Sequence, residues 1–264
     1  EEEQSFWCFV SLMKGKKHHL RNFFSPGFPA LEKMRTVWEY ALNHHYKSVA
    51  KKLNELGIKT LHYSSKNGTE FTVDIHPEMN FLAGGETTYS GVFYNPNMPT
   101  EECFTSPIKT SANGVVMATK PLSVRGVLVS DFGFRFENRK VVEVLCKKQE
   151  DKDVLTNLIS TDEGAAMLGE VALVPFDSPV NQTNLLFYNT LYDENACCHL
   201  AIGRAFNECI KDYQHKTEEE IKAIDLNTSM IHVDFMIGSQ DLSIIAETYD
   251  GNEVQIFKNG TWAI

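Results

Sequence analysis

The sequence contains a histidine and an aspartate two residues apart inside an apolar run that a glycine ends, residues 231–238. Such a run predicts a strand followed by a turn. Because side chains alternate along a strand, His232 and Asp234 would share one face, with Val233 and Phe235 on the other. An imidazole and a carboxylate placed in this way can bind one cation, or two adjacent ones. A water-facing pair and a simple His–Asp hydrogen bond are the alternatives, since an unpaired buried Asp would cost several kcal/mol.

Three more polar residues stand where the surrounding pattern is apolar. Glu170 begins a predicted strand. His199 lies in the apolar part of a predicted helix over residues 185–206, a pattern that indicates burial. Glu102 lies near the end of a segment rich in glycine and proline, residues 76–107, and long irregular segments inside compact domains are often functional. These residues join His232 and Asp234 as candidate ligands.

The five candidates are two histidines and three carboxylates, a mixed nitrogen and oxygen set that suits zinc, cobalt or manganese. Five protein ligands are more than one catalytic zinc normally takes, so the set fits two ions with one carboxylate bridging them. Each residue also has a simpler interpretation: His199 as a satisfied core histidine, Glu170 as a strand end in water, and Glu101 with Glu102 as a solvated loop pair. The successive elements are 68, 29 and 33 residues apart, and such spacing alone does not show that they converge.

Composition narrows the class of protein. The chain has 264 residues, 42% of them hydrophobic and 23% charged, which is ordinary for a globular domain. A net charge of −10 argues against general nucleic-acid binding, and no apolar run approaches the ~20 residues that span a membrane. Three glutamates precede the short apolar patch at residues 6–10, which is the wrong charge for a secretory signal. The six cysteines form no C-x-x-C pair, so we expect reduced thiols in a cytoplasmic protein.

Periodicity predicts an α+β fold, with a mixed, largely antiparallel sheet, inserted helices and a single domain over residues 28–264 after an atypical arm, residues 1–27. The predicted helices cover residues 28–57, which Gly57 ends, and residues 153–159, 185–206 and 216–224. The predicted strands cover residues 60–64, 70–75, 114–120, 124–130, 132–137, 141–147, 170–174, 231–237, 242–247 and 254–257, the last two as a hairpin across Asp250-Gly251.

Several motifs occur in an order that resembles the aminopeptidase T and aminopeptidase S family of thermophilic-type metalloaminopeptidases. They are PTEECFTSP at 99–107, ATKPLS at 118–123, LGEVALVP at 168–175, LFYNTL at 186–191, DENA at 193–196 and HVDFMIGS at 232–239. The resemblance runs from about residue 59 to the end of the chain. It implies an aminopeptidase in which a two-metal site activates a water, which then hydrolyses the peptide bond that follows the N-terminal residue. The metal ligands that the resemblance implies are Glu102, Glu170, His199, His232 and Asp234.

The resemblance also implies how this chain differs from the family. Residues 28–264 would be the metallopeptidase catalytic domain, and the family's N-terminal domain, which precedes it, would be absent. Family subunits pair into homodimers, so a homodimer is the assembly suggested here. Glu102 or Glu170 would move a proton to the leaving amine, and Lys120 and Arg204 are weaker candidates for substrate contacts.

Phe206 is the clearest departure from the family pattern. The family carries a catalytic tyrosine seven residues after the helix histidine, where this sequence has phenylalanine. In the predicted helix, positions 199 and 206 would share a face. A phenylalanine cannot donate a hydrogen bond to an oxyanion, and losing one such donor typically costs on the order of 10²–10³ in rate. The alternative hypothesis is therefore a truncated or degenerate relative that binds metal or peptide with little turnover.

Overall fold

Two antiparallel sheets make up most of the computed structural model, which describes residues 45–84, 86–87, 90–94 and 100–264. Within this part, the larger sheet has the strand order β10-β9-β6-β2-β1-β14-β15-β16. Its strands are β1 (Ile58–Ser65), β2 (Thr69–Asp74), β6 (Asn113–Met117), β9 (Phe132–Glu137), β10 (Lys140–Cys146), β14 (Ser243–Thr248), β15 (Glu253–Lys258) and β16 (Thr261–Trp262). The hairpin predicted across Asp250-Gly251 is confirmed as the antiparallel pair β14 and β15.

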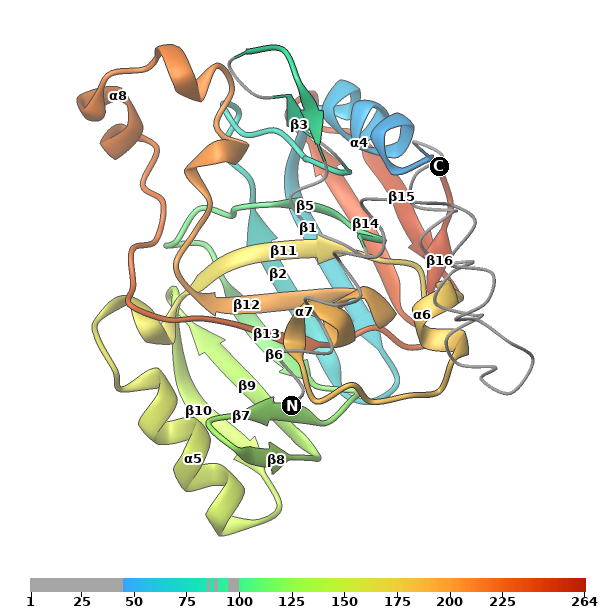
Figure 1. Ribbon diagram of the computed structural model, residues 1–264, viewed down its shortest axis with the longest axis vertical. Coiled ribbons are helices and arrows are strands. Elements are labelled where there is room, and N and C mark those ends of the chain that lie inside the picture. The colour runs from blue at the N-terminus through green and yellow to red at the C-terminus, as the bar shows by residue number, and fades with distance from the viewer. Residues whose placement is uncertain (1–44, 85, 88–89, 95–99) are drawn as a thin grey trace.

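The smaller sheet has the order β13-β12-β11-β5. Its strands are β5 (Cys103–Thr105), β11 (Leu168–Leu173), β12 (His199–Gly203) and β13 (His232–Met236). Figure 1 shows these strands crossing in front of the strands of the larger sheet. Two short pairs complete the described strands: β3 (Glu86–Thr87) with β4 (Phe93–Tyr94), and β7 (Leu122–Val124) with β8 (Val127–Val129).

The core lies between the two sheets. Phe235 on β13 packs edge-on against Phe134 on β9, with ring centroids 5.1 Å apart, and also contacts Phe132. All three side chains are buried. Because side chains alternate along β13, the same strand that buries Phe235 in the core points Asp234 to the opposite face of the smaller sheet.

Five helices and four single 3₁₀ turns accompany the strands in the described part. They are α4 (His45–Leu56), α5 (Gln149–Ile159), α6 (Pro179–Gln182), α7 (Thr190–Asp193) and α8 (Glu218–Ala223), with single 3₁₀ turns η1 (Gly164–Ala166), η2 (Glu194–Ala196), η3 (Asn207–Cys209) and η4 (Tyr213–His215). Gly57 ends α4 at φ 61°, a conformation that glycine adopts without strain. Thr217 and Glu220 form a reciprocal capping box that starts α8. Among the described helices, none is both long and apolar enough to cross a bilayer.

The predicted fold class is confirmed: antiparallel sheets with few inserted helices. The helix predicted over residues 28–57 is seen only as α4, because the residues before 45, with the arm at 1–27, lie outside the described part. The strand predicted over 124–130 is wrong in detail. Arg125 and Gly126 both have positive φ, 51° and 78°, and form a two-residue turn between β7 and β8.

The helix predicted over residues 185–206 is wrong. The chain forms α7 and the turn η2, and then the strand β12. The stretch from Ala196 to Gly203 is apolar at almost every position, and periodicity cannot separate a buried strand from a buried helix in so short a run. The strand forms because β11 and β13 bond to its two edges, which satisfies its backbone groups in the interior.

Candidate metal centre

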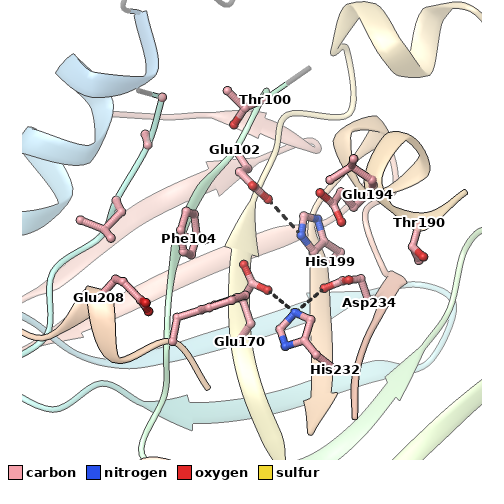
Figure 2. Close-up of a pocket in the computed structure, with 15 residues that line it drawn as sticks. Thr100, Glu102, Phe104, Glu170, Thr190, Glu194, His199, Glu208, His232 and Asp234 are labelled. Carbon is pink, nitrogen blue, oxygen red and sulfur yellow. Dashed lines mark hydrogen bonds and ion pairs between the residues drawn. The ribbon is translucent and has the colours of Figure 1, made fainter. Parts of the chain in front are cut away.

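One face of the smaller sheet gathers all five predicted ligands. Glu170 lies on β11, His199 begins β12, and His232 and Asp234 lie on β13. Glu102 comes directly before β5. Each strand of this sheet therefore carries, or directly follows, at least one candidate ligand, as Figure 2 shows.

Small residues on β12 leave room between these ligands. In the strand register, Ala201 lies opposite Glu170 on one side and opposite Asp234 on the other. Gly203 lies opposite His232. Antiparallel partners in register lie on the same face, so a larger side chain at position 201 would fill the space that the two carboxylates border.

The side chains of the five residues meet in two groups (Figure 2). His199 Nε2 lies 3.2 Å from Glu102 Oε2. His232 Nε2 lies 3.1 Å from Glu170 Oε2 and 3.3 Å from Asp234 Oδ1. His199 and the three carboxylates are buried, and His232 is partly buried.

Backbone carbonyls fix the tautomers of both histidines. His232 Nδ1 lies 2.7 Å from the carbonyl oxygen of Arg204, and His199 Nδ1 lies 3.3 Å from that of Cys197. A carbonyl only accepts, so both Nδ1 atoms must donate. In the neutral rings, Nε2 then presents a lone pair to carboxylate oxygens, which requires either a proton or a cation between them.

The buried carboxylates also need a positively charged group to compensate their charge. Glu102 Oε2 and Asp234 Oδ1 are buried and, despite the nearby histidines, neither makes a hydrogen bond of normal geometry to any described residue. Buried charged oxygens without donors are costly unless a cation compensates them. The residues present therefore fit divalent cations bound by imidazole nitrogen and carboxylate oxygen.

Protonation balances the charge when no cation is bound. Burial raises the pKa of Glu170 to about 7. Burial alone would lower the pKa of the two histidines, but their carboxylate neighbours outweigh it and raise the pKa of His199 to about 10 and of His232 to about 11. Burial would likewise raise the pKa of Asp234, but His232 and His199 lower it.

Glu194, in the turn η2, is a carboxylate at the centre that the sequence analysis did not select. One of its carboxylate oxygens lies within 4.8 Å of a ring nitrogen of His199 and of a carboxylate oxygen of Asp234. Burial, together with the charges of Glu102 and Asp234, raises its pKa well above the ordinary value. The DENA motif at 193–196 was the sequence signal that could have identified Glu194. The predicted helix at 185–206 did not indicate where its side chain would point.

A cavity of about 590 Å³ opens onto the centre. Leu82, Phe104, Leu191 and Phe206 supply apolar wall, and Glu208 adds an exposed carboxylate. Its volume lies in the usual range for a small-ligand site, roughly 300–1,000 Å³.

Phe206 lines this cavity, but the backbone that carries it is not the predicted helix. It lies after β12, outside any helix, and its N–H donates to Ser106 Oγ at 2.8 Å. Its ring packs against the ring of His232, with centroids 4.7 Å apart, and edge-on against Phe104 at 5.7 Å. The shared helical face predicted for positions 199 and 206 is therefore wrong, although Phe206 does lie beside the centre.

The two weaker candidates do not line the cavity. Arg204 has an exposed side chain, and it meets the site only through the carbonyl that fixes His232. Lys120 lies close enough to Asp193 to lower the pKa of that carboxyl, against a larger rise caused by burial. Neither position supports a direct substrate contact.

The chain is similar in sequence to known metalloproteases. Residues 33–262 match the family model described as thermophilic metalloprotease (M29). The chain is 47% identical to aminopeptidase AmpS of Bacillus subtilis over 211 residues. This match covers 80% of this chain and 51% of that protein. It is 38% identical over 256 residues to aminopeptidase T of Thermus aquaticus, covering 90% of this chain and 62% of that protein.

The fold agrees as well. The wild-type AmpT structure from Thermus thermophilus superposes with a TM-score of 0.79 at 36% identity, over 90% of this chain and 61% of that one. The chain thus spans about half the length of the first of these curated relatives and about three fifths of the aminopeptidases T.

Proposed function

Because the chain belongs to the thermophilic metalloprotease (M29) family, we propose that it is a metal-dependent aminopeptidase with a dinuclear centre. Its substrates would be peptides with a free N-terminus. The residues that would hold the two ions are Glu102, Glu170, His199, His232 and Asp234, with Glu170 as the shared carboxylate.

The observation that carries the proposal is the direction of the two imidazoles. Both Nδ1 atoms donate to backbone carbonyls, so both Nε2 atoms point at carboxylates. A structural His–Asp pair would need only one such contact, and a water-facing pair would not be buried. Two rings held in the metal-binding tautomer, on one face of one sheet, support two adjacent cation positions.

When bound, divalent zinc, cobalt or manganese would supply Lewis acidity that polarises a scissile carbonyl and acidifies a water. The protein's own groups would do the rest. Glu102 and Glu170 both line the cavity, and one of them would move a proton to the leaving amine. The apolar wall would exclude water and receive the substrate side chain.

The test combines elemental analysis of the purified chain with a leucine-anilide assay, with and without added cobalt or zinc. We expect about two ions per chain and hydrolysis that a chelator abolishes. A double variant, His232→Ala with Asp234→Ala, should lose both properties, while His62→Ala, an exposed histidine on β1, should keep them. Full metal-dependent activity in the double variant would refute the proposal.

Phe206 favours one second candidate, a degenerate relative that binds metal or peptide with little turnover. The family resemblance puts a catalytic tyrosine at this position, and Phe206 lines the cavity beside His232 without a hydroxyl. Phenylalanine removes no metal ligand, so this candidate predicts a full complement of metal with almost no release of product. The same pair of measurements therefore separates the two functions.

A further inference from the structure

We infer that Asn227 is a positioning residue: it fixes the peptide group whose carbonyl oxygen orients the ring of His232. Asn227 is 3% exposed and is not among the residues that line the cavity. It lies in the segment between α8 and β13, which passes the start of β11 and the end of β12 in Figure 1. The expected effect on metal binding rests on the proposed function, whereas the orientation of the ring is measurable without any metal.

The ring of His232 is held by main chain. Its Nδ1 lies 2.7 Å from the carbonyl oxygen of Arg204, whose side chain is exposed. This carbonyl belongs to the peptide group between Arg204 and Ala205, and the N–H of that group donates to the main-chain oxygen of Asn227 at 3.0 Å. A peptide group is planar, so a shift of Asn227 at one end would turn the carbonyl at the other end away from the imidazole.

The side chain of Asn227 fixes the preceding peptide group. Its Nδ2 donates to the carbonyl oxygen of Gly203 at 2.6 Å. The N–H of Arg204, in the same peptide group, donates to the carbonyl oxygen of Ile231 at 2.7 Å. Both peptide groups that flank Arg204 are therefore hydrogen-bonded at both ends, which fixes the direction of its carbonyl.

A further hydrogen bond prevents the amide of Asn227 from turning. Its Nδ2 also donates to the carbonyl oxygen of Gly164 in η1, at 2.8 Å. An amide nitrogen carries two hydrogens, and the carbonyls of Gly164 and Gly203 take one each. Both glycines are buried, so rotation of the side chain would leave two buried carbonyls without this donor.

Gly169 provides the space that the Arg204 carbonyl occupies. A Cβ at position 169 would lie 2.3 Å from the oxygen of Arg204 and 2.4 Å from that of Gly203, far inside van der Waals contact. The residue directly before Glu170 is therefore glycine because another backbone segment approaches it closely. The bonds from Asn227 and the space at Gly169 are two separate features that fix the same oxygen.

The experiment compares the full chain with Asn227→Asp, which keeps the shape of the side chain and removes the Nδ2 donor. In the metal-free proteins, NMR follows the Nδ1 proton of His232, which is assigned by its absence in His232→Ala. We expect this proton to exchange with water about tenfold faster in Asn227→Asp, because its acceptor is no longer held in place.

Metal binding gives the second measurement. Zinc affinity is determined by competition with a chromophoric chelator, and the absorption spectrum of bound cobalt reports the coordination. A ligand whose supporting hydrogen bond is disturbed typically binds metal about 10–100-fold more weakly. We expect a loss of this size in Asn227→Asp for the ion that His232 binds, together with a changed cobalt spectrum.

Two control variants separate positioning from a merely structural role. Asn181→Asp removes a similar bond, from Nδ2 to the carbonyl oxygen of Phe176 at 2.6 Å, next to α6. It should lower thermal stability as Asn227→Asp does and leave the His232 proton, the zinc affinity and the cobalt spectrum unchanged. Arg204→Ala should also leave all three unchanged, because His232 uses only the main chain of residue 204.

The outcomes separate this inference from the proposed function. If Asn227→Asp keeps the parent's exchange rate at His232, the inference is overturned, even where stability falls. If Asn227→Asp does not fold, Asn227→Ser removes the same donor without adding a charge and should show the same faster exchange. If the parent chain binds no metal, the proposed function fails, and the His232 proton still decides whether Asn227 positions the ring.

Discussion

Metal binding to this centre should release protons, and the affinity should therefore rise steeply with pH. Without metal, the carboxylates hold a proton on each imidazole, with a pKa of about 10 for His199 and about 11 for His232. Both values lie above the ordinary histidine pKa of about 6.5. An ion that binds Nε2 must displace this proton, so protons compete with the metal at every pH below these values.

The size of the effect follows from the two pKa values. At pH 7, which lies well below both pKa values, removing the proton costs on the order of 4–5 kcal/mol at either imidazole. Each pH unit changes that cost by about 1.4 kcal/mol, which is tenfold in affinity per displaced proton. Between pH 6.5 and pH 8.5, the dissociation constant of each ion should fall about a hundredfold. Below pH 7 the slope should steepen, because Glu170 also takes up a proton there.

Isothermal titration calorimetry in two buffers of different ionisation enthalpy measures the protons released. We expect about one proton per zinc ion at pH 8, and the chelator competition should give the hundredfold change. The variant His62→Ala, on the other sheet, should release as many protons as the parent chain. An affinity that stays level above pH 7.5 would mean that the imidazoles have ordinary pKa values, and the carboxylate contacts would not be as described.

Three further substitutions test separate parts of the molecule. Phe206→Tyr should raise turnover in the leucine-anilide assay by roughly 10²–10³ without changing metal content, if the missing hydroxyl limits catalysis; unchanged turnover would mean that another step is limiting. Ala201→Val places two more carbons between Glu170 and Asp234, so zinc affinity should fall, with strain of about 1–3 kcal/mol. Unchanged affinity would mean that the space opposite these two carboxylates does not require alanine at position 201. Phe134→Ala, in the core between the sheets, should lower the free energy of urea unfolding by about 3–5 kcal/mol, and a loss below 1 kcal/mol would contradict its tight packing.

The strand that carries His232 and Asp234 could be predicted from the sequence because its two faces differ. Val233 and Phe235 alternate with the two polar residues, and Phe235 is buried against the aromatic residues of β9. Alternation of this kind specifies both the secondary structure and the direction of each side chain. The fold class followed from the same kind of pattern in the other strands.

The strand that carries His199 could not be predicted in this way, because both of its faces are buried. Every residue from His199 to Gly203 is buried, so no alternation of polar and apolar residues marks a face. What decides the conformation is the hydrogen bonding to β11 and β13, which come from residues about 30 positions away on either side. The convergence of the ligands depends on that register, and so does the direction of Glu194.

Phe206 lies beside the candidate site, although the helix from which this position was predicted does not form. A helix would carry residue 206 back over residue 199 after nearly two turns. In the structure, β12 ends at Gly203 with φ 104°, where a Cβ would lie 2.1 Å from the backbone oxygen of Ile231. That glycine lets the chain turn at the strand end, and the hydrogen bonds with Ser106 then hold Phe206 over His232. The turn at Gly203 thus brings the ring at position 206 against the imidazole of His232, on the wall of the cavity.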